Sequence, residues 1–229
     1  MSNFINALRN RAGASAAVLL VIAGAGALPS CNIVVPAAYI IGGPPSVDAE
    51  FQLPDRRTVV FIDDTRNMLP RTSLRTRIGD TTSTRLQQKE QITQAIAPSE
   101  AMQVARRFDS QTKRMSIRQI GEEVGAETII HVKITLFALT PDGETPRPVA
   151  EAEVKVIDVA AGTRLYPQGP DGMRKVMAQL REQKPEDYRS SAGRRALEDA
   201  LADELGKEIA NLFHKHEKKE LGENLGVRG

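Results

Sequence analysis

The chain has 229 residues, with 31 Lys and Arg against 29 Asp and Glu and a formal net charge of +2. Arg9 and Arg11 are the only charged residues before Asp48, so residues 31–229 carry 31 − 2 = 29 basic and 29 acidic residues. This balance excludes a broadly basic surface for nucleic acid. The single cysteine excludes an internal disulfide and any multi-cysteine metal site.

The first 28 residues have the layout of an export signal. Residues 1–11 contain two arginines and no acid, and residues 12–28, AGASAAVLLVIAGAGAL, carry no charge. A positive segment followed by an apolar run is typical of a secretory signal. The apolar run is slightly shorter than the about 20 residues that a membrane-spanning helix needs.

The sequence Leu28-Pro29-Ser30-Cys31 closes this leader and resembles the bacterial lipoprotein signal, in which a leucine and a small residue precede a lipidated cysteine. The resemblance implies that residues 1–30 are removed and that Cys31 carries diacylglycerol on its thiol and a fatty acid such as palmitate on its amino group. Several acyl chains anchor a protein firmly. Two alternatives remain open: Cys31 as a buried apolar thiol, and the leader as an uncleaved membrane anchor.

Composition divides the rest of the chain. Residues 31–56 are rich in proline and glycine, which predicts a tether between the lipidated cysteine and the domain. Residues 57–217 form the predicted domain, and residues 218–229 a flexible tail. With 4% aromatic residues and no tryptophan, the core of this domain must consist of Val, Ile, Leu and Ala.

Hydrophobic spacing predicts the elements of the first half of the domain. Residues 57–64, RTVVFIDD, are apolar on both faces and predict a central strand. A helix is expected at 71–88 and a short strand at 90–98. The next helix is expected to begin with Ser99 as its N-cap and to extend to residue 108.

A short helix and three strands are expected next. Ser116 and Gln119 have the spacing of a capping box, which predicts a helix that ends at Gly125. Alternating apolar residues then predict strands at 127–139, 148–159 and 162–167. Together these form an antiparallel meander with one apolar face and one wet face. The residues expected on the apolar face are Ile130, Val132, Ile134, Leu136, Ala138, Ala150, Ala152, Val154 and Val156.

Two helices complete the prediction. One is expected at 171–183, with Met173, Val176, Met177 and Leu180 on one side, and a long amphipathic helix is expected from 194 to 216. Its apolar stripe comprises Ala196, Leu197, Ala200, Leu201, Leu205, Ile209, Leu212 and Phe213. The predicted fold class is α/β (α+β): a single mixed sheet with an antiparallel meander, helices mainly on one face, and a long C-terminal helix.

The order of elements between Arg57 and Tyr166 resembles the TolB amino-terminal-like family, which also includes the CsgG-like lipoproteins of curli secretion. The matching features are Gly125-Ala126-Glu127 before a strand, and Val156, Asp158 and Gly162 at the end of the next. The resemblance implies a mixed α/β domain that binds other proteins in the cell envelope. It implies no catalytic residue.

Three groups of side chains are candidates for chemistry. Asp63 and Asp64 end the central strand, where ligands of α/β sheets often bind, but they also suit a turn. Glu151 and Glu153, with His131, Lys133 and Lys155, suit an acid–base cluster or charge pairs on a wet sheet face. His214 and His216 are two residues apart on the predicted helix, so they are expected to be solvated. Ser73, Ser99 and Ser116 are capping candidates.

These observations predict no catalytic residue, no cofactor and no metal site, and they assign lipidation to Cys31. The function they favour is that of a lipid-anchored envelope lipoprotein, with its domain in the periplasm or otherwise outside the cytoplasmic membrane. The domain is expected to act as a non-catalytic protein-interaction or assembly module that binds an envelope partner. The alternatives are a metal-dependent or acid/base hydrolase that uses Asp63 and Asp64, and a homo-oligomeric structural or secretion component.

Overall fold

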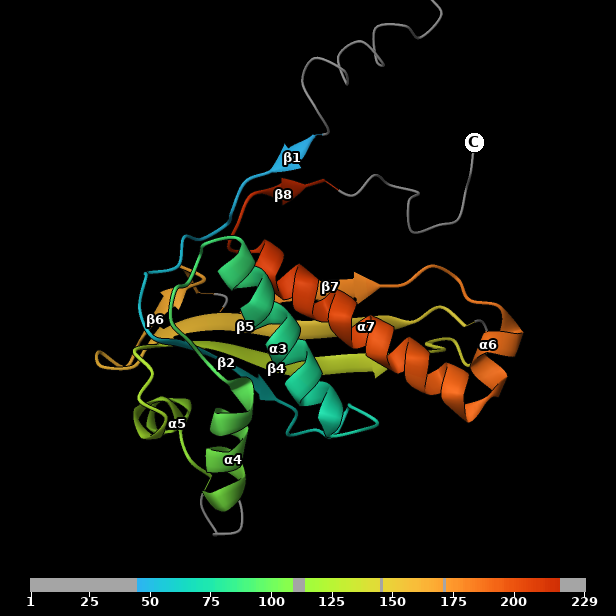
Figure 1. Ribbon diagram of the computed structural model, residues 1–229, viewed down its shortest axis with the longest axis horizontal. Coiled ribbons are helices and arrows are strands. Elements are labelled where there is room, and N and C mark those ends of the chain that lie inside the picture. Colours follow the sequence, from blue (N-terminus) through green and yellow to red (C-terminus); the bar gives the residue numbers. More distant parts are fainter. Residues whose placement is uncertain (1–44, 109–113, 145, 171, 219–229) are drawn as a thin grey trace, which may run out of the picture. The chain divides into compact units, whose positions relative to one another are not determined.

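The computed structural model describes residues 45–108, 114–144, 146–170 and 172–218 (Figure 1). The chain divides into two units, residues 1–45 and 46–229, and every described helix and strand belongs to the second. The predicted signal peptide, Cys31 and nearly all of the predicted tail lie outside the described residues. No helix in the described ranges is long and apolar enough to cross a membrane.

A six-stranded mixed sheet forms the centre of the fold, in the order β3-β2-β4-β5, with β6 and β7 both paired to β5. The strands β3, β2 and β4 are parallel, whereas β4, β5, β6 and β7 pair as antiparallel neighbours. This arrangement confirms the predicted single mixed sheet with its meander. The strands are β2 (Thr58–Asp63), β3 (Ala95–Ile96), β4 (Thr128–Ala138), β5 (Val149–Asp158), β6 (Thr163–Tyr166) and β7 (Arg174–Gln179).

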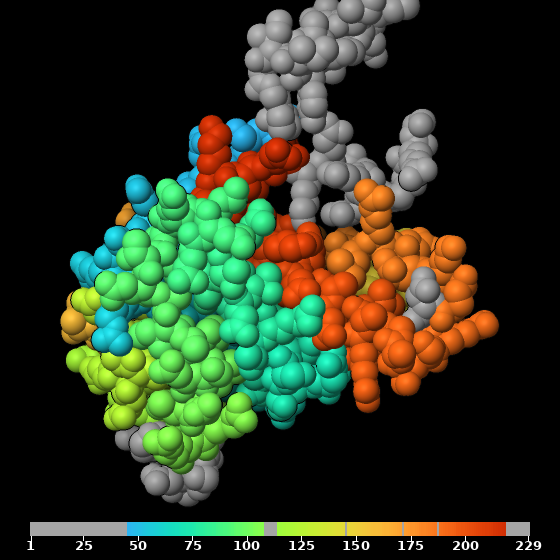
Figure 2. Space-filling model, in the orientation of Figure 1, coloured from blue at the N-terminus to red at the C-terminus, as the bar shows by residue number. Residues whose placement is uncertain are grey.

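Two long helices, α3 (Ser73–Gln88) and α7 (Ser191–Asn211), lie side by side on one face of the sheet (Figures 1 and 2). They run parallel, because Arg71 contacts Glu198 near their starts and Thr82 contacts Gly206 further along. The apolar residues of β2, β4 and β5 that point toward them form the main core. Its fully buried members include Val60, Ile62, Leu74, Ile78, Ile130, Ile134, Val154, Leu201, Leu205 and Ile209.

A second, smaller core lies on the opposite face of β2. The helices α4 (Pro98–Phe108) and α5 (Ile117–Glu123) cover this face, and the core contains Val59, Phe61, Ile96, Met102, Ile120, Ile129 and Val159. The capping box of α5 is present, because the side chains of Ser116 and Gln119 each accept from the other residue's backbone N–H. Gly125 follows that helix with a φ of +66°, as its predicted position requires.

The predicted helix at 171–183 is wrong, since residues 174–179 form β7 beside the amino-terminal half of β5. Val176 and Ala178 are buried, whereas Lys175 and Met177 are exposed, which is the period of a strand. The apolar residues at 173, 176, 177 and 180 also fit a helical spacing, so spacing alone did not separate the two structures. A short helix, α6 (Pro185–Arg189), comes later in the chain.

Leu136 does not continue the buried row of β4. The pairing of β4 with β5 shifts between Ile134 and Leu136, and Phe137 is buried in place of Leu136. One extra residue in a strand reverses which side chains face the core. The alternation of β5 is confirmed, with Ala150 and Val156 among its buried residues.

The C-terminal helix is confirmed, with differences in its buried stripe and at both ends, since it begins at Ser191. Its buried stripe contains Ala202 and Ala210, whereas Ala196 and Ala200 are exposed. The helix ends at Asn211. The following residues lead to β8 (His216–Glu217), which pairs with β1 (Ser46–Val47).

Residues 50–53 of the predicted tether pack on the domain. The backbone N–H groups of Glu50 and Phe51 donate to the carbonyl oxygen of Leu212, and Leu53 is buried in the main core. The carboxylate of Glu50 forms two hydrogen bonds with the guanidinium of Arg174 at 2.6 and 2.7 Å and accepts a third from the hydroxyl of Tyr166. This segment therefore joins the end of α7 to β6 and β7.

Candidate functional site

Asp64, one of the two acids that end β2, has a structural role. Its side chain is buried and accepts hydrogen bonds from the backbone N–H groups of Met68 at 2.7 Å and Leu69 at 3.2 Å. The guanidinium of Arg75 on α3 lies 3.4 Å from the same carboxylate and donates to the carbonyl oxygen of Asp64 at 3.1 Å. These contacts hold the loop between β2 and α3, as the turn interpretation predicts, and they occupy both carboxylate oxygens.

Asp63 instead faces a histidine on the neighbouring parallel strand. Its Oδ2 lies 3.3 Å from Nε2 of His131, and its Oδ1 accepts from the backbone N–H of Thr65. Burial raises the pKa of Asp63, but the hydrogen bond and charge of His131 and the bond from Thr65 outweigh it, so the pKa lies below its usual value. The ring of His131 stacks on Phe61, and its Nδ1 has no hydrogen-bond partner in the described structure.

This pairing differs from the predicted acid–base cluster. Sequence alternation predicted His131 on a wet face opposite Glu151 and Glu153, but His131 is 4% exposed, because α4 and α5 cover that part of the sheet. Only the parallel pairing of β2 with β4, in which Phe61 is opposite His131, brings Asp63 within reach. Alternation within one strand cannot reveal a parallel neighbour.

A cavity of about 290 Å³ opens beside Asp63, between the carboxyl end of β2 and the helices α4 and α5. Apolar side chains, including Met102 and Met115, form part of its wall. Its polar lining comprises Asp63, Asp64, Thr65, Asn67, Arg75, Arg106 and Arg114. An ionised carboxylate hydrogen-bonded to an imidazole can move a proton. No serine, cysteine or third acid lines the cavity among the described residues, so a nucleophile would have to be the hydroxyl of Thr65 or water.

On the sheet face that α4 and α5 cover in part, the region over β4 and β5 carries alternating charges. Nζ of Lys133 on β4 lies 3.1 Å from Oε2 of Glu153 on β5, and both side chains are about 30% exposed, at 31% and 27%. A pair as exposed as this contributes about 1 kcal/mol or less. Glu151 and Lys155 flank it on β5, so the predicted charge pairing on a wet face is confirmed for Lys133 and Glu153.

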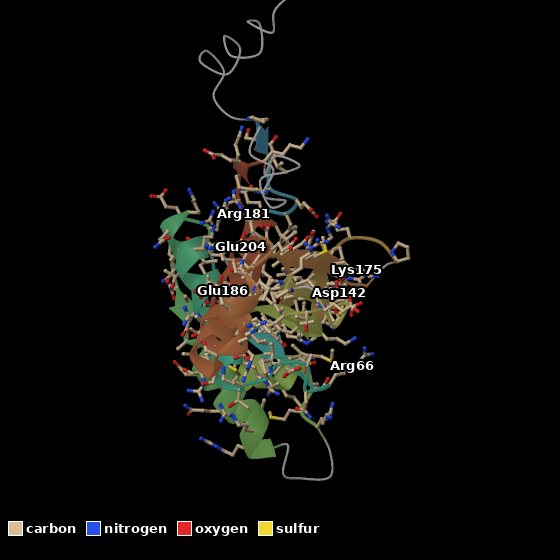
Figure 3. The ribbon with its side chains drawn as sticks, turned by 90° about the vertical axis from the view of Figure 1, so that its right-hand side faces the viewer. Arg66, Asp142, Lys175, Arg181, Glu186 and Glu204 are labelled. Carbon is tan, nitrogen blue, oxygen red and sulfur yellow. The ribbon has the colours of Figure 1, made fainter. Side chains whose placement is uncertain are left out.

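Met177 lies on the same open face and is 59% exposed, the most exposed large apolar side chain of the described residues. It borders a hollow of about 510 Å³ whose lining also includes Arg66, Thr135, Glu151, Glu153 and Lys175. In Figure 3, Arg66 and Lys175 lie on the side of the sheet away from Glu204 of α7. This face therefore presents an apolar centre that is surrounded by both positively and negatively charged side chains.

The structure also places the two histidines after α7 and the three serines that were candidates for helix caps. His214 is 3% exposed and His216 is half-buried, so the expectation that both are solvated on a helix is wrong. Both residues follow α7, and His214 packs where the chain turns back toward β8. Ser116 caps α5, whereas Ser73 and Ser99 are the first and second residues of their helices and not N-caps.

The described residues bring together no group of three or more His, Cys, Asp or Glu side chains that could hold a metal ion. The assignment of lipid to Cys31 falls outside the described residues and stays a prediction. Sequence reasoning missed Arg75, Arg106 and Arg114 at the cavity. Arg106 and Arg114 are more than 40 residues from Asp63, and Arg75 is on the helix that follows β2, where its spacing gives no sign of a contact with the end of the strand.

No known protein family and no curated protein matches the chain. Among solved structures, a lipoprotein of Neisseria meningitidis is similar over 63% of this chain and 94% of its own, with 8% identity and a TM-score of 0.36. PelC of Paraburkholderia phytofirmans, solved as a dodecamer, is similar over 74% of this chain and 95% of its own, with 14% identity and a TM-score of 0.36.

A protein of Xanthomonas campestris is similar over 76% of this chain and 86% of its own, with 9% identity and a TM-score of 0.42. At such scores these likenesses carry no argument about function. The resemblance to the TolB-like and CsgG-like family is not confirmed and stays a prediction.

Proposed function

We propose that this protein is an exported, lipid-anchored protein of a bacterial envelope and that its domain binds another protein without catalysing a reaction. The leader and Cys31 support export and anchoring. The observation that carries the binding role is the open face of β4, β5 and β7, with Met177 59% exposed among alternating charges.

The open face has the composition of a protein-binding surface. An apolar anchor that is surrounded by polar residues and becomes buried on binding is the usual centre of a protein interface. Lys133, Glu153 and Lys175 supply charges of both signs, which set the orientation of a partner more than its affinity. The strand β7 also pairs with β5 alone in the described sheet, so its other edge offers free backbone groups.

Site-specific crosslinking in the native envelope tests this proposal. A photo-reactive residue in place of Met177 should give one defined crosslinked product, and the same residue in place of Gln87, which is exposed on α3, should not. Adding Lys175→Glu should weaken the product at 177. A product of twice the mass of the chain would support the homo-oligomer alternative, and identical patterns from both positions would refute the assigned face.

A hydrolase is the second candidate, and the contact of Asp63 with His131 beside the cavity favours it. Asp64 is engaged by Met68, Leu69 and Arg75, so Asp63 alone would act as the base. The purified chain should be assayed on chromogenic esters, phosphate esters and glycosides. Turnover that disappears in Asp63→Asn and persists in Asp199→Asn would favour the enzyme, whereas equal turnover in both variants indicates a contaminant.

A further inference from the structure

A second cavity, of about 540 Å³, lies where the C-terminal ends of α3 and α7 meet the β1–β8 pair. Figure 1 shows both helices ending on this side, and Figure 2 shows the segment after α7 beside β1. The cavity is lined by Ser46, Arg85, Lys89, Asn211, His214, Lys215, His216, Glu217 and Lys218. Four of these side chains carry a fixed positive charge, and only Glu217 carries a negative one.

The parallel packing of the two helices creates this concentration of charge. Arg85 lies in the last turn of α3, and Lys89 directly follows that helix. Lys215 and Lys218 follow α7. Cations near the end of a helix are favourable because of its dipole, and this explains Arg85 and Lys89 without a ligand. It does not explain Lys218, which is outside both helices and lines the same cavity.

Three buried polar atoms of the lining have no hydrogen-bond partner in the described part of the chain: Nε of Arg85, Oδ1 of Asn211 and Nε2 of His214. The residues Asn211 and His214 are 8% and 3% exposed. A buried polar atom without a partner costs about 1–3 kcal/mol. The three residues line one basic cavity, so a polar group bound there would lie beside them.

We propose that this cavity binds a phosphate group, which Arg85, Lys89, Lys215 and Lys218 attract and with which the imidazole of His214 forms a hydrogen bond. The oxygens of a phosphate accept from guanidinium and ammonium groups. A protonated phosphate oxygen could donate to the free Oδ1 of Asn211. The inference goes beyond the proposed binding of a protein, and the site does not overlap the open face around Met177.

Two sources of phosphate fit this chemistry: the headgroup of an anionic lipid and a free phosphate ester or ion. Ser46 of the lining is 46 − 31 = 15 residues after Cys31, which an extended chain spans in at most about 50 Å. An anchor at Cys31 therefore allows the cavity to reach a lipid surface. Only the lipid source depends on the proposed anchoring.

Binding should take up a proton at His214. Its Nδ1 donates to the carbonyl oxygen of Lys215 at 2.8 Å, so Nε2 is unprotonated in the neutral ring and can donate only after protonation. Burial lowers the pKa of His214, and the charges of Arg85, His216 and Lys89 lower it further. Only the backbone of Lys215 contacts this ring, since its ammonium group lies 3.4 Å from the carboxylate of Asp48. The acid Glu208 of α7 is in contact with Asn211. A bound anion adds the negative charge that favours protonation.

The test uses the purified full chain in detergent and calorimetric titration with inorganic phosphate. The double variant Arg85→Gln/Lys89→Gln should bind about tenfold more weakly or worse, because it lacks two charge-assisted hydrogen bonds. The matched control, Arg106→Gln/Arg114→Gln, removes two positive charges at the other cavity and should bind as the native chain does. Equal loss in both variants, or no saturable binding by the native chain, would overturn the proposal.

Sulfate keeps its charge between about pH 5 and pH 8, so the pH dependence of its binding tests whether His214 takes up a proton. It should bind the native chain and His216→Gln more tightly in acid, whereas His214→Gln should lose most of this dependence. If the pH dependence of sulfate binding were unchanged in His214→Gln, His214 would not be part of the site. A soluble short-chain phosphatidic acid that binds about tenfold more tightly than inorganic phosphate identifies a lipid headgroup, and equal affinities identify a free phosphate.

Discussion

Gly206 of α7 lies so close to Thr81 of α3 that a Cβ at position 206 would be 2.8 Å from the Cβ of Thr81. The same Cβ would be 2.9 Å from the carbonyl oxygen of Ile78. The hydroxyl of Thr82 donates to the carbonyl oxygen of Gly206 at 3.1 Å. A glycine here therefore sets how closely the two parallel helices pack.

Gly206→Ala should lower the free energy of unfolding by about 1–3 kcal/mol, because backbone and a β-branched side chain cannot move aside. The higher helix propensity of alanine, worth about 1 kcal/mol, offsets only part of this cost. Chemical denaturation measures the change. Ala200→Ser, which adds one atom at an exposed position of the same helix, is the control and should change stability by no more than about 0.5 kcal/mol.

Ile134→Ala should cost about 2–5 kcal/mol, since Ile134 is 1% exposed and lies between the sheet and the helices. Met177→Ala on the opposite face of the sheet should leave the melting temperature nearly unchanged. Thermal unfolding of both variants compares the two faces. Unchanged stability in Ile134→Ala would mean that the assignment of the two faces is reversed.

Asp64→Ala should destabilise the chain by about 3–5 kcal/mol, because it leaves two backbone N–H groups without their buried acceptor and removes the carboxylate that pairs with Arg75. Asp199→Ala removes a carboxylate that is 34% exposed and should cost about 1 kcal/mol or less. Urea unfolding distinguishes the two. An Asp64→Ala variant as stable as Asp199→Ala would contradict the structural role of Asp64.

Stability should fall as the pH drops below about 6.5, the ordinary pKa of histidine. The pKa of His214 is lowered in the folded chain, so the unfolded chain binds a proton more readily in this range, and acid favours unfolding. The stabilisation from neutral His214 is complete above the pKa of this residue in the unfolded chain. It is lost as the pH falls through the lower pKa of His214 in the folded chain. His214→Gln should show a smaller slope of unfolding free energy against pH, while His216→Gln provides the comparison.

Cys31→Ser should stop lipid attachment and leader removal together, while export continues, because targeting depends on the charged and apolar segments and not on the thiol. Mass spectrometry of the membrane-extracted protein decides this. The native chain should begin at a modified Cys31, and the variant should retain Met1. An intact Met1 or a free Cys31 thiol in the native protein would favour the uncleaved anchor.

Most of the elements could be predicted from the sequence, because their signals are local. Alternation in β4 and β5, the capping box at Ser116 and the apolar stripe of α7 each depend on residues close together in the chain. The strand β7 could not be separated from a helix, because its apolar residues fit both periods and only pairing with β5 selects the strand. The shift near Leu136 likewise depends on the partner strand.

The sequence by itself determined the features that need no partner: the positive segment and uncharged apolar run before Cys31, the neutral balance of charge after it, and the fold class. Only the tertiary structure decided which side chains meet. Asp63 reaches His131 through parallel strands 68 residues apart in sequence, and Arg85 meets His214 because two helices end together. Contacts of this kind depend on packing between distant segments, which local periodicity does not specify.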